Sequence, residues 1–160
     1  MMFNQFSKHE QGFQDWRHDG MPGLRAESYR CIEFLTSPDD DQMARDAEKL
    51  LQQAADEKHK LLLSVVNWGE IYYNTMRQVS QEAAEQKARE IAMLPIEIVG
   101  VGDDLALARQ AAIFKATKKM SYADCFAAAL AKVRNAELVT GDPEFKQVQG
   151  DVRISWLGAK

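Results

Sequence analysis

Three acidic residues of the chain have the type and placement expected of a site that binds a divalent cation. Glu70 lies about one helical turn after the apolar run LLLSVV, Asp142 directly follows the run AELVT, and Asp124 falls in the first turn of a predicted helix. Mg²⁺ and Mn²⁺ prefer oxygen ligands, and Mg²⁺ keeps several of its waters. A few carboxylates with open coordination positions therefore suit a cation that also contacts a substrate phosphate.

Such a group of acids would support hydrolysis of a phosphodiester bond. The cation would polarise the phosphoryl oxygen and supply a hydroxide-like water, while a second ion could stabilise the leaving oxygen. This chemistry needs no Ser, Cys or His nucleophile. The histidines His9, His18 and His59 have no metal-ligand spacing, and we interpret them as surface residues.

Helix capping is the alternative explanation for each acid. The motifs Asn67-x-x-Glu70 and Ser121-x-x-Asp124 have the spacing of an N-cap residue followed by an acid at the third helical position. Asp142 precedes a proline, which is a common arrangement at a helix start. Capping alone would explain any one of the three, so only their convergence on one place favours a cation site.

The elements that must position these acids alternate between strands and helices. Short apolar runs predict strands, and amphipathic stretches between them predict helices. This alternation predicts an α/β domain in three layers, α/β/α, with a central parallel sheet covered on both faces. The carboxyl ends of parallel strands meet at one edge of a sheet, so the acids that follow them should converge. The predicted strands are 61–66, 96–100, 136–140 and 152–157, and the predicted helices are 39–58, 67–78, 81–94, 103–119 and 121–134.

Composition limits the classes of protein that the chain can be. A length of 160 residues indicates one domain, and 46% hydrophobic with 28% charged residues is ordinary for a soluble protein. The net charge of −4 provides no global basic surface, so contact with nucleic acid would depend on a local patch or on cations. Cys31 and Cys125 form no disulfide framework or zinc motif, and no apolar run is long enough to span a membrane. We therefore expect a cytoplasmic protein.

Three segments also carry a family resemblance. SVVNWGEIYY, MSYADCFAAALAK and AELVTGDPEFK, in this order, are similar to the three later acidic motifs of the PIN domain family. Within that family the chain most resembles VapC-like toxins, the ribonucleases of type II toxin-antitoxin systems. The similarity covers roughly residues 24–157 and implies the PIN fold.

The resemblance implies a role for each matching residue. Glu70, Asp124 and Asp142 would be catalytic carboxylates that bind Mg²⁺ or Mn²⁺, Thr140 a catalytic hydroxyl that supports the site, and Glu144 an auxiliary acid. It also implies a metal-dependent endoribonuclease that acts on RNA, a cognate antitoxin as partner, and a homodimer. The aromatic and apolar residues Trp68, Tyr72, Tyr73 and Met76 are expected on one helical hairpin, where they suit core packing or a partner helix.

The amino-terminal part departs from the family pattern. The family opens with an apolar strand that ends in Leu-Asp-Ser, whereas this chain reads LRAESYRCIEFL. Aligning Ser28 puts Glu27 at the position of the first aspartate, as a doubtful fourth ligand. Residues 1–23 have no counterpart, so we predict a poorly ordered extension over 1–23 and the PIN-like domain over 24–160. A weakened catalytic site would leave a second function open, that of a PIN fold that binds an antitoxin or another partner.

Overall fold

The chain folds around a five-stranded parallel sheet with the strand order β3-β2-β1-β4-β5. The computed structural model describes residues 29–32 and 41–158 of the chain. The segment 1–23, predicted to be an extension, lies outside these residues. The strands are β1 (Tyr29–Ile32), β2 (Lys60–Ser64), β3 (Ile96–Val99), β4 (Glu137–Thr140) and β5 (Arg153–Trp156).

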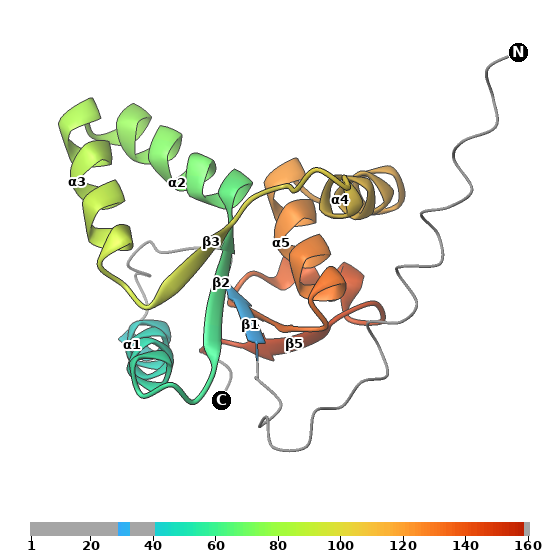
Figure 1. The fold of residues 1–160 in the computed structure, drawn as a ribbon, viewed down its shortest axis with the longest axis horizontal. Coiled ribbons are helices and arrows are strands. Elements are labelled where there is room, and N and C mark those ends of the chain that lie inside the picture. The colour runs from blue at the N-terminus through green and yellow to red at the C-terminus, as the bar shows by residue number, and fades with distance from the viewer. Residues whose placement is uncertain (1–28, 33–40, 159–160) are drawn as a thin grey trace, which may run out of the picture.

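The helices cover both faces of the sheet and so make the predicted α/β/α fold. Figure 1 shows α4 and α5 on one side of the sheet and α1 on the other, with α2 and α3 as a projecting hairpin. The helices are α1 (Asp41–Ala55), α2 (Val65–Gln78), α3 (Gln81–Ala92), α4 (Ala106–Thr117) and α5 (Tyr122–Val133), and a 3-10 helix, η3, spans Pro143–Val148.

Two apolar clusters stabilise this arrangement, one on each face of the sheet. Leu62 and Leu138 pack with α4 and α5, while Leu61 and Leu63 pack with α1 and the α2–α3 hairpin. All three leucines of β2 are 1% exposed or less. Burying such a side chain contributes roughly 1.5–3 kcal/mol, so alternate residues of β2 hold helices to opposite faces.

The central strand β1 lies at a different position in the sequence from the one predicted for the first strand. The family resemblance, aligned at Ser28, implied that the first strand ends before Glu27, whereas β1 begins at Tyr29 and pairs in parallel with β2 and β4. Glu27 lies outside the described residues. In the sequence it comes before β1, whereas the first acid of the family pattern comes at the end of the first strand. Arg30 makes this strand hard to recognise, because a cation interrupts the apolar pattern. Its Nε lies 3.2 Å from Glu137 Oε2 on β4, so the charge is paired inside the sheet.

Two other predictions need correction. His59 was interpreted as a surface residue but is 9% exposed, because it immediately precedes the buried strand β2. Burial, with the Arg30 cation as a second cause, holds its pKa below the usual range. The predicted strand 61–66 ends at Ser64, because the Ser64 hydroxyl accepts hydrogen bonds from Val66 N–H and Asn67 N–H and starts α2 there.

Candidate active site

Glu70 lies in the second turn of α2, which follows β2 directly. Ser64 is the N-cap of this helix, so Asn67 is not, and the predicted capping explanation of Glu70 is wrong. Glu70 therefore has no capping role, and its position is determined by the rigid strand-to-helix connection at the carboxyl edge of the sheet. Its side chain is half-buried.

Asp124 lies in the first turn of α5, where the predicted cap is confirmed. Asp124 N–H donates to Ser121 Oγ at 3.1 Å, and the Ser121 hydroxyl donates to Asp124 Oδ2 at 2.6 Å. These bonds fix the orientation of the carboxylate at the start of the helix. The other carboxylate oxygen, Oδ1, remains available for a further contact.

The structure brings Glu70 and Asp124 together, although 54 positions separate them in the sequence. Burial raises the pKa of the Glu70 carboxyl, the negative charge of Asp124 raises it further, and a hydrogen bond with Tyr73 opposes both effects. A nearby negative charge disfavours ionisation of the Glu70 carboxyl. This repulsion makes the pair a place where a cation would bind favourably.

Asn67 connects the two helices that carry the pair. The side chain is completely buried, and its Nδ2 donates to the carbonyl oxygen of Ala123 at 3.0 Å. Ala123 is the residue before Asp124, and Glu70 lies one turn after Asn67 on α2. The contact therefore ties the first turns of α2 and α5 together beside the acid pair.

Asp142 follows β4 and caps η3, as the sequence predicted. Its Oδ1 accepts a hydrogen bond from Glu144 N–H at 2.8 Å, and its own N–H donates to Thr140 Oγ1 at 2.9 Å. Thr140 is completely buried at the end of β4, whereas the Glu144 residue is exposed. Thr140 therefore holds the turn that carries Asp142, while Glu144 lies at the outside of that turn.

The acids fit a divalent cation as a partial set of ligands. Over residues 29–32 and 41–158, no group of three or more His, Cys, Asp or Glu side chains lies close enough to hold a metal ion. Glu70 and Asp124 nevertheless supply two hard oxygen donors, and Mg²⁺ commonly binds through one or two carboxylates with its remaining positions open to water and substrate. The donor chemistry therefore suits Mg²⁺ or Mn²⁺ at this pair.

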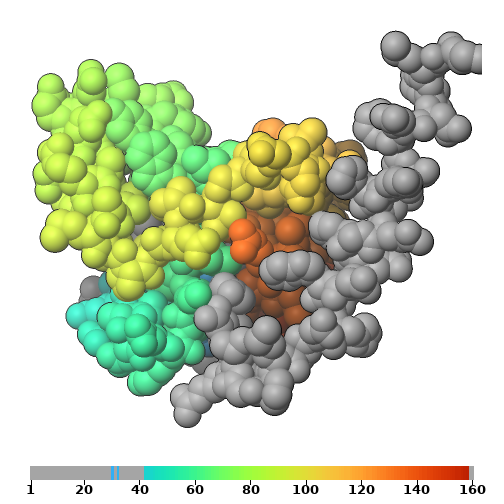
Figure 2. All heavy atoms as spheres, in the orientation of Figure 1, coloured from blue at the N-terminus to red at the C-terminus, as the bar shows by residue number. Residues whose placement is uncertain are grey.

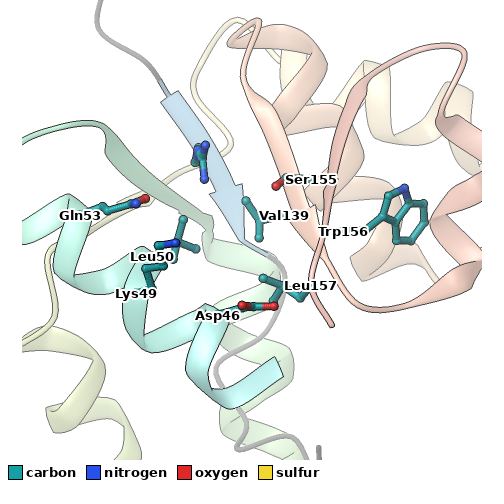
Figure 3. Close-up of a pocket in the computed structure, with 9 residues that line it drawn as sticks. Asp46, Lys49, Leu50, Gln53, Val139, Ser155, Trp156 and Leu157 are labelled. Carbon is teal, nitrogen blue, oxygen red and sulfur yellow. The ribbon is translucent and has the colours of Figure 1, made fainter. Parts of the chain in front are cut away.

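A separate cavity of about 340 Å³ lies between α1 and the strands β1, β4 and β5. Figure 3 shows Lys49 and Gln53 of α1 on one side and Ser155 of β5 on the other. The acid there, Asp46, accepts a hydrogen bond from Gly158 N–H through Oδ2. None of the predicted site residues lines this cavity, so it is not part of the acid site.

Three polar residues near the acids were not predicted from the sequence as parts of the site. Ser64 and Asn67 are completely or almost completely buried polar residues of the β2–α2 connection. Gln147 exchanges two hydrogen bonds with the backbone of Lys119 and so joins η3 to the loop before α5. Only the run SVVN could have indicated a structural role for Ser64 and Asn67, because polar residues at the end of an apolar strand often cap the following helix.

Comparison with known families identifies the fold. The PIN domain family model matches residues 31–151. The chain belongs to the PIN domain family. The matched region starts after Glu27 and contains Glu70, Asp124 and Asp142. PIN domain toxins are generally nucleases, and PIN domain nucleases generally use divalent metal ions.

Solved structures of VapBC proteins share the fold. VapBC2 from Rickettsia felis, bound to a DNA fragment from its promoter, has a TM-score of 0.57 at 14% identity, with 81% of this chain and 98% of that chain covered. DNA-bound VapBC from Salmonella typhimurium also has a TM-score of 0.57, at 16% identity, with 81% and 97% covered. VapC20 from Mycobacterium tuberculosis, a sarcin-ricin loop cleaving toxin, has a TM-score of 0.56 at 17% identity, with 76% and 95% covered.

Two further comparisons are negative. No curated protein matches the sequence of this PIN domain protein. Among the helices in the described part of the chain, none has the length and apolar character needed to cross a membrane.

Proposed function

We propose that this PIN domain protein is an Mg²⁺- or Mn²⁺-dependent endoribonuclease and the toxin of a toxin-antitoxin pair. The observation that carries the proposal is the pairing of Glu70 with Asp124, because burial and mutual repulsion raise the pKa of Glu70 at an edge of the sheet. Support for RNA as the substrate and for a toxin role comes from structures of the same fold, which include a sarcin-ricin loop cleaving toxin.

Each residue of the site has a separate part in this proposal. Glu70 and Asp124 would hold the cation, and a bound cation would supply polarisation of the scissile phosphate and activation of a water. Asp142 lies in the turn after β4, where its carboxylate would add negative charge beside the site, and Thr140 holds that turn through the hydrogen bond from Asp142 N–H. Glu144 is exposed beside the same turn and would contribute as an auxiliary acid.

RNA hydrolysis by the purified protein tests this function. We expect cleavage with Mg²⁺ or Mn²⁺, and none after removal of metal by EDTA. Asp124→Asn and Asp142→Asn should each lower turnover at least about 100-fold, because positioned charges and metal ligands commonly contribute that much. Glu48→Gln, which changes an exposed acid of α1, is the matched control and should keep full activity. Metal-independent cleavage, or full activity of both Asn variants, would exclude the mechanism.

A second function, that of a PIN fold that mainly binds a partner, is favoured by one observation. Tyr73, Met76 and Val79 of the α2–α3 hairpin are 45%, 46% and 72% exposed, respectively. Figure 2 shows this hairpin as a projecting lobe of the molecule. Apolar side chains exposed on a helix suit the apolar face of a partner helix. Such a partner, an antitoxin or a second copy of the chain, is compatible with the ribonuclease as well.

A further inference from the structure

Asn67 is the only asparagine or glutamine in the described part of the chain that is completely buried. It lies in the first turn of α2, one turn before Glu70, and under the start of α5. Buried amide side chains usually make hydrogen bonds through both their nitrogen and their oxygen, because desolvation of either atom costs free energy.

The Asn67 nitrogen makes one long-range contact. Nδ2 donates to Ala123 O at 3.0 Å, across 56 positions of the sequence. Since Ala123 is covalently joined to Asp124, this bond fixes the distance between the backbone of Asp124 and that of Asn67. The α-helical geometry of α2 then fixes Glu70 relative to Asn67.

The Asn67 side-chain oxygen differs from the nitrogen in its hydrogen bonding. Oδ1 is buried and has no hydrogen-bond partner among the described residues. A buried unpaired acceptor destabilises the folded protein, so an apolar residue of similar size would be at least as stable at this position. The amide at position 67 is therefore not explained by stability, and its one definite contact is the bond that aligns the two acid-bearing helices.

We propose that Asn67 is a positioning residue that holds Glu70 and Asp124 at the spacing required by a divalent cation. This inference rests on the proposed function, since it concerns the cation bound by the same pair. Misplaced ligands lower the affinity for Mg²⁺ and Mn²⁺ strongly, because their coordination geometry is demanding. Asn67 itself need not touch the cation.

Titration of Mn²⁺ into metal-free protein, followed by calorimetry, tests the proposal without relying on activity. Asn67→Leu keeps the size of the side chain and removes both polar atoms. We expect it to melt at or above the temperature of the metal-free wild type, yet to bind Mn²⁺ about tenfold or more weakly, as substitutions that disturb ligand orientation commonly do. Asn67→Ala should show the same loss of affinity and serves if the Leu variant does not fold.

Two controls separate positioning from a general effect on stability. Ser80→Ala removes the cap of α3, where Ser80 Oγ accepts from Ala83 N–H, and should lower the melting temperature without weakening Mn²⁺ binding. In a Glu70→Gln background, Asn67→Leu should add little further loss, because the spacing between the two carboxylates no longer matters once one of them is removed.

The outcomes also separate this inference from the proposed function. Wild-type affinity in Asn67→Leu and Asn67→Ala, or a fully additive loss in the Glu70→Gln background, would overturn the positioning role and leave the ribonuclease proposal intact. Absence of Mn²⁺ binding by the wild type would overturn the proposed function, and the positioning role with it.

Discussion

At the residue scale, Glu70 carries the strongest sign of a binding site. Its carboxyl is half-buried, and burial followed by the charge of Asp124 raises its pKa. Because the folded pKa lies above the unfolded value, folding favours the protonated form. The resulting stabilisation is present below the unfolded pKa, about 4.3 for Glu, and is lost as the pH rises through the folded pKa.

Removal of this charge should therefore stabilise the metal-free protein. In EDTA at neutral pH, Glu70→Gln should raise the free energy of unfolding by less than about 1 kcal/mol, since solvent screens a half-exposed group. The gain should disappear below about pH 4, where the wild-type carboxyl is protonated. Denaturant titrations across this pH range measure the effect. Glu82→Gln is the control of opposite sign, because Glu82's own backbone N–H and Ser80 lower the pKa of Glu82. A destabilised Glu70→Gln protein at neutral pH would contradict the repulsion.

The sequence predicted two of the three helix caps at these acids correctly. Capping by Asp142 and by Ser121 was recognised from short-range motifs, and both caps are present. The proposed cap at Asn67 was wrong, because Ser64 starts the helix three residues earlier. A polar residue at the end of a buried strand and one in the next turn look alike in sequence, and only long-range packing distinguishes them.

At the element scale, β1 is a strand that could not be recognised from the local sequence pattern. The strand is four residues long and contains Arg30, so its pattern resembles a helix start or a loop. Arg30 is accommodated only because β4 places Glu137 directly beside it. Such compensation between strands more than 100 positions apart is invisible to local periodicity.

The register of β1 leads to a prediction about the first acidic position. Glu27 precedes the strand, whereas Glu33 is the next residue after its carboxyl end, and both lie outside the described residues. Because residues that follow parallel strands reach the edge where Glu70 and Asp142 lie, Glu33→Gln should reduce RNA cleavage at least about tenfold. Glu27→Gln should have little effect. Initial-rate assays with folding checked by circular dichroism compare them, and the reverse order of effects would restore Glu27 as the ligand.

At the scale of the whole molecule, the sequence predicted the layers and the parallel sheet. Long runs such as the buried leucines of β2 and the apolar α5 determine these features, and each is apparent within about ten residues. The order of the strands requires contacts between distant segments, so the sequence pattern left it open. The parallel arrangement predicted that Glu70, Asp124 and Asp142 converge. The charge of Asp124 acts on Glu70, but the described residues contain no group of three such side chains that could hold a metal ion.

The exposed hairpin predicts how the molecule associates. Replacing Tyr73 and Met76 with Ser should weaken binding of a co-expressed antitoxin if the partner is an antitoxin, and should dissociate the homodimer if the partner is a second copy of the chain. Exposed apolar anchors commonly dominate such interfaces. Ile113→Ser on α4 changes an equally exposed apolar residue and should have no effect. Co-purification and sedimentation velocity measure both forms of association. A wild type that is only monomeric, with no partner bound on co-expression, would count against the hairpin as an interface.

Calorimetric titration of Mn²⁺ into EDTA-treated, dialysed protein measures directly whether Glu70 and Asp124 together bind a divalent cation. We expect saturable binding for which Mg²⁺ competes. Glu48→Gln should retain this binding, and Asp124→Asn and Glu70→Gln should each weaken it by at least about tenfold. Wild-type protein that binds no Mn²⁺, or variants of both acids that bind it as tightly as the wild type, would contradict cation binding by this pair.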